Sequence, residues 1–434
     1  MPFRTRYRAS ARLGLAFAAT LTLSLVSPAA AKAQTEPPAL SLTDALAKAA
    51  GADPTLAGSD ARLAAAQANL RQAGVRPNPT LGVDLENFAG TGAYSLLDRS
   101  EATVSYQQIL ERGGKREART GRARAEIEVA RLRREVRTLD LIRDVQVAYA
   151  EATAAEAELL IAEARLVAAH QSQTVIDRRV KAARDPLFAG SRADMMTAQA
   201  QIARDQARDR ARDARAALAR FWGGSSAFRL ALEPFFDAKR PVMPASLTVA
   251  DLALLEAERD VTIANVRVEQ ARAVVDPTVR AGVRYLGDGN NVAFVVGGTI
   301  PLRRYDTNRS GIERAQAERT AAEADITAAR LAREREIAQL ISKISSAATE
   351  AERIRAEVIP PAIRSVEQVR EGFGRGGFSY LDVTEAERAL ADARARRVSV
   401  LRQYHLDQAA LDRLTGRQAG LTQTQTQTQT AEPR

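Results

Sequence analysis

The feature that most constrains this chain is a long run without helix-breaking residues. Residues 122–185, roughly 64 in number, contain neither glycine nor proline, and an unbroken helix of that length extends roughly 95 Å at 1.5 Å per residue. Apolar residues recur in the run at steps of three and four, the spacing of one helical face: Leu132, Val136, Leu139, Ile142, Val145 and Tyr149. No compact domain needs such a helix. The run therefore predicts a rod that packs along other long helices.

Self-similarity at a spacing of about 190 residues indicates that this unit occurs twice. Two pairs of segments carry the similarity: PTLGV at 79–83 with PTVRA at 277–281, and ALARFWG at 217–223 with ALDRLTG at 410–416. We expect each half to contain, in order, a leading helix, a pair of strands, a long helix, a glycine-rich turn and a returning helix.

The two halves have predicted bounds. We expect a first repeat at residues 34–232, a linker at 233–247 and a second repeat at 248–416. The strands are predicted at residues 80–88, 102–109, 278–286 and 292–300. The second long helix lacks glycine and proline over residues 312–359 and then meets Pro360-Pro361. Because proline removes a backbone donor and clashes with the preceding turn, we expect a kink there rather than an end.

The first 33 residues have the three parts of a secretory signal peptide. Four arginines within residues 4–12 are followed by an apolar run at 13–27 and by Ala31-Lys32-Ala33, an A-x-A cleavage pattern. About 15 apolar residues fall short of the roughly 20 that a membrane-spanning helix needs, and no later run comes closer. At the other end, residues 417–434 contain a Thr-Gln repeat, which predicts a disordered tail.

Composition excludes several classes of function. The chain has no cysteine, which excludes disulfides, thiolate metal sites, thiol nucleophiles and a lipidated N-terminal cysteine. The formal charge of +10 falls to +5 without residues 1–33, because these hold five basic residues and no acid. The remaining charges of both signs are interleaved on helices, as on a solvated face, and no recognition motif is present, so nucleic acid is not an expected partner.

Four predicted helix starts share one signature, a hydroxyl residue followed three positions later by aspartate. They are Ser41-x-x-Asp44, Ser191-x-x-Asp194, Thr248-x-x-Asp251 and Ser379-x-x-Asp382. Such pairs satisfy free backbone N–H groups and place negative charge at the positive end of the helix dipole. We therefore expect a helix cap at each.

The predicted strands are about nine residues long, which matches a tilted membrane-spanning strand. Apolar and polar residues alternate in them, although a half-buried soluble sheet shows the same alternation. The predicted export favours membrane-spanning strands over a soluble sheet. A sheet in lipid must close, and four strands cannot close alone, because the smallest such barrels have about eight. Two chains would supply eight strands and three would supply twelve; the strand count alone does not choose.

Over residues 41–416 the chain resembles the TolC-like outer-membrane efflux channels. The resemblance rests on the duplication, on the strand pairs between helices, and on segments 188–194, 359–362 and 376–383. Residues 106–116 (YQQILERGGKR) resemble the branch that serves heavy-metal efflux pumps of the cobalt–zinc–cadmium type. In that branch the turn formed by Arg112, Gly113, Gly114, Lys115 and Arg116 lies at the membrane–periplasm boundary, where Lys115 and Arg116 can snorkel toward lipid headgroups.

The resemblance implies a fold that is mainly α with β. Long antiparallel helical hairpins form an α-barrel in the periplasm, and four membrane strands per chain form a shared 12-stranded barrel in a homotrimer embedded in outer-membrane lipid. It implies two partners, a periplasmic membrane-fusion adaptor and an inner-membrane RND-type pump. The channel itself is expected to be passive, with no cofactor and no enzymatic activity, and its expected cargo is heavy-metal cations.

The resemblance also assigns roles to the turns between long helices. Asp194 and Asp382 are the gate candidates, since acid rings select cations or close a gate by hydrogen bonding; capping a helix is the simpler role of both. The residues expected to contact the adaptor are Gly190, Ser191, Arg192, Gly376, Gly377, Phe378 and Ser379. One departure from the family pattern is the segment 184–187 (RDPL), which replaces a shorter first tip.

Other motifs do not carry chemistry. Residues 372–377 match G-x-G-x-x-G, but the dinucleotide motif requires a preceding strand and a βαβ unit, whereas helices flank this one. His170 and His405 are the only histidines, and neither lies in a metal-ligand cluster. We expect no catalytic residues and no resident metal site.

Two alternative functions stay open. The same channel fold could serve drug efflux or type I protein secretion. A soluble periplasmic coiled-coil adaptor is the alternative of another class, although adaptors carry one hairpin between β-rich modules, and this chain has two strand pairs that each precede a hairpin.

Overall fold

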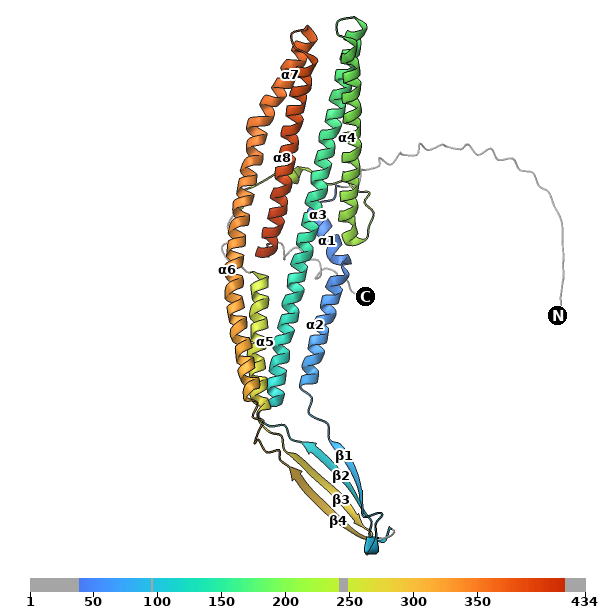
Figure 1. Ribbon diagram of the computed structural model, residues 1–434, viewed down its shortest axis with the longest axis vertical. Coiled ribbons are helices and arrows are strands. Elements are labelled where there is room, and N and C mark those ends of the chain that lie inside the picture. The colour runs from blue at the N-terminus through green and yellow to red at the C-terminus, as the bar shows by residue number, and fades with distance from the viewer. Residues whose placement is uncertain (1–38, 95–96, 242–248, 418–434) are drawn as a thin grey trace, which may run out of the picture. The chain divides into compact units, whose positions relative to one another are not determined.

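The computed structural model describes residues 39–94, 97–241 and 249–417. Long helices run side by side there, and a four-stranded sheet continues from one of their ends (Figure 1). The predicted signal peptide and most of the predicted tail lie outside the described residues. Among the described helices, none combines the length and the apolar character that crossing a bilayer requires.

The first half contains the predicted rod. Its helices are α1 (Leu42–Ala52), α2 (Pro54–Ala73), α3 (Lys115–Lys181) and α4 (Leu187–Ala219). Helix α3 has 67 residues, about 100 Å at 1.5 Å per residue. It begins before Gly121 and ends earlier than predicted, because Ala183 has a positive φ of 52° and Pro186 lacks the N–H that a continuing helix needs.

The second half repeats this order with an interruption. Its helices are α5 (Ala250–Arg272), α6 (Arg309–Arg353), α7 (Ile359–Arg375) and α8 (Tyr380–Thr415). Helices α6 and α7 are joined by a π-helical segment, Ile354–Val358, so the helix does not end at the prolines. Pro360 and Pro361 fall in the first turn of α7, where a missing N–H costs least. The helix therefore continues past the prolines, as predicted, and its α-helical hydrogen bonding is interrupted by a π-helical segment.

The four strands form one antiparallel sheet in the order β1-β2-β3-β4. The strands are β1 (Thr80–Glu86), β2 (Glu101–Ile109), β3 (Thr278–Leu286) and β4 (Asn291–Thr299). Each predicted strand is present to within two residues at either end. The two strand pairs do not stay separate, because β2 of the first half pairs with β3 of the second over nine residue positions.

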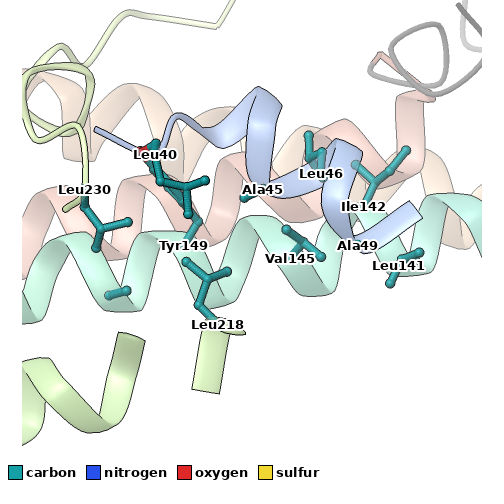
Figure 2. Close-up of a cluster of buried hydrophobic side chains, with 11 residues drawn as sticks. Leu40, Ala45, Leu46, Ala49, Leu141, Ile142, Val145, Tyr149, Leu218 and Leu230 are labelled. Atoms are coloured by element: carbon teal, nitrogen blue, oxygen red, sulfur yellow. The ribbon is translucent and has the colours of Figure 1, made fainter. Parts of the chain in front are cut away.

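Equivalent positions form the cores of the two halves. Leu218 is fully buried against α1 and α3 in the cluster of Figure 2, with Val145 and Tyr149. Its counterpart Leu411 is 4% exposed and packs with Ile337 and Leu340 of α6. Each half thus buries its returning helix against its own long helix, as the repeated sequence requires.

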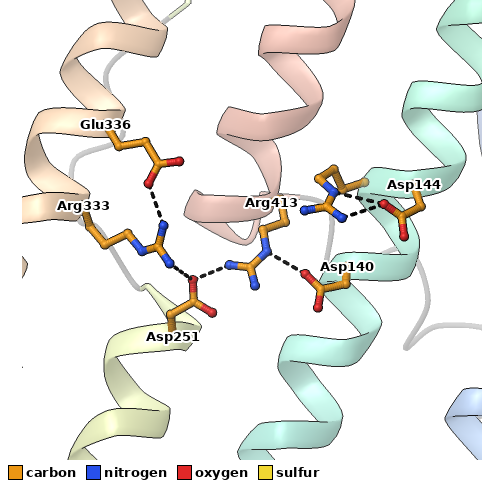
Figure 3. A network of polar contacts seen from close by, with 7 residues as sticks. Asp140, Asp144, Asp251, Arg333, Glu336 and Arg413 are labelled. Atoms are coloured by element: carbon orange, nitrogen blue, oxygen red, sulfur yellow. Dashed lines mark hydrogen bonds and ion pairs between the residues drawn. The ribbon is translucent and has the colours of Figure 1, made fainter. Parts of the chain in front are cut away.

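A polar network connects the halves where α8 ends and α5 begins, beside α3 and α6 (Figure 3). Arg413 of α8 donates to Asp140 of α3 at 2.9 Å and also pairs with Asp251 of α5. Arg333 of α6 approaches Asp251 at 3.4 Å and Glu336 at 2.6 Å. The half-buried guanidinium of Arg413 thus joins elements from both repeats.

Only two of the four predicted helix caps are present in the described residues. Ser41 and Ser379 both form complete capping boxes with the aspartates three positions later. The prediction of a cap at Ser191 was wrong, because α4 begins at Leu187 and Ser191 lies inside the helix. Thr248 lies outside the described residues, and α5 begins after Val249 without a side-chain cap.

Candidate functional site

The sheet has one apolar face, and that face is exposed. The register brings its residues together across all four strands: Leu81, Val83, Leu85, Ala102, Val104, Tyr106, Ala281, Val283, Tyr285, Val292, Phe294 and Val296. Several are largely exposed, with 72% for Leu81, 87% for Phe294 and 84% for Val296. An exposed apolar surface of this kind is typical of contact with a membrane or a partner. The sheet is therefore not folded against the chain's own interior.

The opposite face of the sheet is polar. It carries all five charged residues of the strands, Asp84, Glu86, Glu101, Arg280 and Arg284. Thr103 and Ser105 between them are only 1% exposed, and the Arg284 side chain bonds to the Thr103 hydroxyl. The charged residues of the strands thus lie on one face only, as in the wall of a barrel with a wet lumen and a lipid-facing exterior.

The turn between sheet and helices is braced across the two halves. The backbone N–H of Arg112 donates to Asp276 Oδ1 at 2.9 Å, and Lys115 Nζ donates to Asp276 Oδ2 at 2.6 Å. Gly113 has φ +70°, and a Cβ there would lie 2.6 Å from Val274, so this turn requires glycine. Lys115 is consequently engaged with Asp276 rather than free to snorkel, whereas Arg116 is exposed.

The tip of the first hairpin is built on Arg179. Its guanidinium pairs with Asp185 across the turn at 2.7 and 3.1 Å. The same group donates to the Phe373 carbonyl at 3.0 Å and lies over the Phe373 ring at 4.6 Å from the centroid. Because Phe373 belongs to α7, this one side chain connects the tips of the two hairpins, which lie at the same end of the helices (Figure 1).

The tip of the second hairpin uses glycine and a capping box. Gly376 ends α7 in the left-handed region at φ +88°, and the Gly377 N–H donates to the Gly372 carbonyl at 2.9 Å. Gly372 also packs against the ring of Phe378, where a Cβ would clash. The glycines of residues 372–377 therefore end a helix and pack an aromatic ring.

The gate candidates have different partners. Asp382 accepts from the hydroxyl and the backbone N–H of Ser379, each at 2.7 Å, and these bonds hold the pKa of Asp382 below its usual value. Asp194 is exposed and accepts from Gln173 Nε2 at 2.6 Å. The contact between the hairpins is made instead by Arg179 and by a buried cluster with Ile176 and Val383.

The adaptor-contact candidates are differently placed in the two tips. Gly376, Gly377, Phe378 and Ser379 form the second turn, as predicted. Gly190, Ser191 and Arg192 lie in the first turns of α4 and not in the turn itself, because Pro186 starts that helix earlier. They nevertheless lie beside the tip.

The most exposed apolar residues of the first tip were not among the predicted site residues. Leu187 is 83% exposed and Phe188 is 70% exposed. Two large apolar residues directly after a proline, at the start of a polar helix, were the available signal. Arg179 was missed as well, because its contact with Phe373 joins residues nearly two hundred positions apart.

No group of metal ligands is assembled in the part of the chain that the structure describes. There, no three His, Asp or Glu side chains gather as a bound metal ion requires. His405 is bonded at 2.9 Å to the Phe235 carbonyl and stacks on the Phe235 ring, so its surroundings are those of a packed core residue.

Comparisons with known proteins agree with this arrangement. The family model described as "Outer membrane efflux protein" matches residues 45–224 and 245–417. The cobalt-zinc-cadmium resistance protein CzcC of Cupriavidus metallidurans is 29% identical, over 87% of this chain and 90% of that protein. The nickel-cobalt-cadmium resistance protein NccC of Alcaligenes xylosoxydans is 28% identical, over 76% of each. The crystal structure of the outer membrane protein VceC from Vibrio cholerae matches with a TM-score of 0.70 and 20% identity, over 86% of this chain and 96% of that one.

Proposed function

The chain belongs to the outer membrane efflux protein family, and from that premise we propose that it is the passive conduit through which a tripartite system exports heavy-metal cations. As a family member it is an outer-membrane efflux channel with its helices in the periplasm, and not an enzyme. Proteins of this family work with an adaptor and an inner-membrane pump. That the adaptor is a membrane-fusion protein and the pump is of the RND type belongs to the proposal.

The proposed cargo rests on the relatives. The names of CzcC and NccC refer to resistance to cobalt, zinc, nickel and cadmium. Deleting the gene in its host is expected to lower tolerance to these cations and to leave tolerance to hydrophobic drugs unchanged. Complementation with the intact gene is the control. Unchanged metal tolerance with new drug sensitivity, or with loss of a secreted polypeptide, would overturn the cargo and favour one of the alternative channel functions.

The proposed assembly is a homotrimer with a 12-stranded barrel. The observation that carries it is the exposed apolar face of a sheet of only four strands, since such a sheet must close in lipid. Native mass measurement of the detergent-solubilised protein is expected to give three chains. Two chains would give an eight-stranded barrel, and a stable monomer, or a protein soluble without detergent, would contradict the assembly.

The proposed adaptor contact is the pair of hairpin tips. Gly190 supports a steric test, because a Cβ built there meets nothing within 4 Å. Gly190→Phe is therefore expected to keep the fold while it blocks the adaptor, which abolishes metal tolerance without lowering the amount of channel in the membrane. Gly121→Phe is the matched control, since a Cβ at Gly121, near the other end of α3, also meets nothing within 4 Å. Equal loss in both variants would contradict a contact at the tip.

The proposed gate residues are Asp194 and Asp382. Asp382→Ala removes a charge and a cap together, so Ser379→Ala is the matched control that breaks the capping box and keeps the carboxylate. If the carboxylate helps to close the tip, conductance in planar bilayers rises in Asp382→Ala and not in Ser379→Ala. Equal conductance in the two variants would leave Asp382 with the capping role alone.

A further inference from the structure

The charged residues of the sheet are arranged around one arginine. Arg284 of β3 donates through Nη1 to Glu101 of β2 at 2.7 Å, and its Nη2 lies 3.2 Å from Glu86 of β1. Its Nε donates to the Thr103 hydroxyl at 2.9 Å. A single guanidinium thus spans three strands that come from both halves of the chain.

The register explains why an arginine is needed at this point. Glu86 and Glu101 stand directly opposite each other on neighbouring strands. Like charges in that position repel and destabilise the pair. The planar fork of Arg284 binds both carboxylates at once, which a lysine ammonium cannot do with the same geometry. The cluster formed by Glu86, Glu101 and Arg284 is called the exit cluster below.

The exit cluster lies at the end of the sheet that is farthest from the helices. Glu86 is the last residue of β1 and Glu101 is the first residue of β2, whereas Thr80 and Ile109 lie at the helical end. One further pair on the same face, Arg280 with Asp84, is looser at 4.0 Å. Because the helices lie in the periplasm, the exit cluster lines the external opening of the lumen in the proposed barrel.

We propose that the exit cluster is a charge filter that makes the channel favour cations over anions as they leave. The proposal rests on the proposed trimeric channel and adds to it the residues that set ion selectivity. Three carboxylates and two guanidiniums on the polar face leave one net negative charge per chain, which three chains would repeat around the lumen. The favoured solute class is hydrated cations, including divalent metal ions.

The reach of these wall charges depends on salt. The Debye length is about 10 Å at 0.1 M ionic strength and about 30 Å at 0.01 M, so fixed charges act across a wide lumen only in dilute salt. Selectivity is therefore expected to be strongest at low ionic strength and to weaken as potassium chloride is added.

The test is the reversal potential of the purified channel in planar bilayers under a gradient of dilute potassium chloride. Arg284→Gln leaves both glutamates unbalanced and is expected to raise the K⁺/Cl⁻ permeability ratio about twofold. The double variant Glu86→Gln with Glu101→Gln leaves Arg284 unbalanced and is expected to lower the ratio by a larger factor, because it changes the net charge by two units per chain rather than one. The two changes are expected to move the permeability ratio in opposite directions. If one variant fails to assemble, the other still tests the proposal.

Two controls separate charge from structure. Arg284→Lys keeps the charge and loses the fork, so the permeability ratio should stay near that of the parent. The exchange Arg284→Glu with Glu101→Arg keeps the net charge and should also leave the ratio unchanged. If the variants conduct and their K⁺/Cl⁻ permeability ratios all equal that of the parent, the charge filter is wrong and the channel function still stands. A protein that forms no conducting pore would instead contradict the proposed function.

Discussion

The two halves of the molecule have the same order of elements, and they differ most where each meets the other. Leu218 and Leu411 occupy equivalent positions and both are buried. Two positions further on, both halves have an arginine, but its surroundings differ. Arg220 is exposed, whereas the Arg413 side chain is 13% exposed and joins α3 and α5. The two repeats thus share the packing within each half and an arginine at this position, but the arginine of the second repeat connects the halves, whereas that of the first is exposed.

The tips of the two hairpins also differ in the interactions that hold them. The first turn is held by the ion pair of Arg179 and Asp185 and has no side-chain cap on α4. The second is held by Gly376 and by the capping box of Ser379. The two equivalent turns therefore form similar hairpins through different local interactions. Each difference between the halves can be tested with a matched pair of variants.

The largest expected effect tests the shared packing. Leu218→Ala and Leu411→Ala each leave a cavity in a packed core and should each lower the free energy of unfolding by about 2–5 kcal/mol. Urea unfolding followed by far-UV circular dichroism measures both. Effects that differ by more than the spread of such substitutions would show that the two cores are not equivalent.

The next effect tests the connection between halves. Arg413→Met leaves Asp140 and Asp251 without their main partner, at a cost of about 2–3 kcal/mol, because the carboxylates are partly buried. Arg220→Met, at the equivalent exposed position, should change stability by less than about 0.5 kcal/mol. The same unfolding measurement applies, and a similar loss in both variants would contradict the asymmetry.

A smaller effect tests the tips. Ser379→Ala removes a capping box and should cost about 1 kcal/mol, whereas Ser191→Ala, inside α4, should cost less than about 0.5 kcal/mol. Hydrogen exchange of the amides at the two helix starts gives a local measurement. Faster exchange at the start of α4 in Ser191→Ala would indicate that Ser191 caps the helix after all.

The smallest effect is a dependence of stability on pH near neutrality, which comes from a histidine of the second half. Burial lowers the pKa of His405, so the folded protein keeps the imidazole neutral while the unfolded chain binds a proton near pH 6.5. Stability from this residue is therefore complete above about pH 6.5 and declines as the pH falls below it.

His405→Gln should reduce this loss of stability between pH 7.5 and 5.5. Arg212, the counterpart of His405 in α4, is exposed and pairs with Asp209 and Asp213. Arg212→Gln is therefore the control that leaves the pH dependence unchanged. An unchanged pH dependence in His405→Gln would mean that His405 is not the group that titrates. Thermal unfolding at a series of pH values makes the measurement.

Much of the candidate site could be predicted because it depends on local pattern. Alternation along residues 80–86 and 278–286 is enough to separate a polar from an apolar face. The turn at Gly376 and the cap at Ser379 follow from residue type and spacing. The first tip was misplaced because a positive φ at Ala183, a residue that rarely adopts one, cannot be recognised from its side chain.

The sequence by itself determined the long helices, the duplication and the four strands, because periodicity and helix breakers act within a few residues of one another. The tertiary structure decided that β2 pairs with β3, that Arg284 bridges Glu86 and Glu101, and that Arg179 reaches Phe373. These contacts join residues from different halves. Their geometry depends on how two long hairpins pack together, and no local pattern of residues specifies that packing.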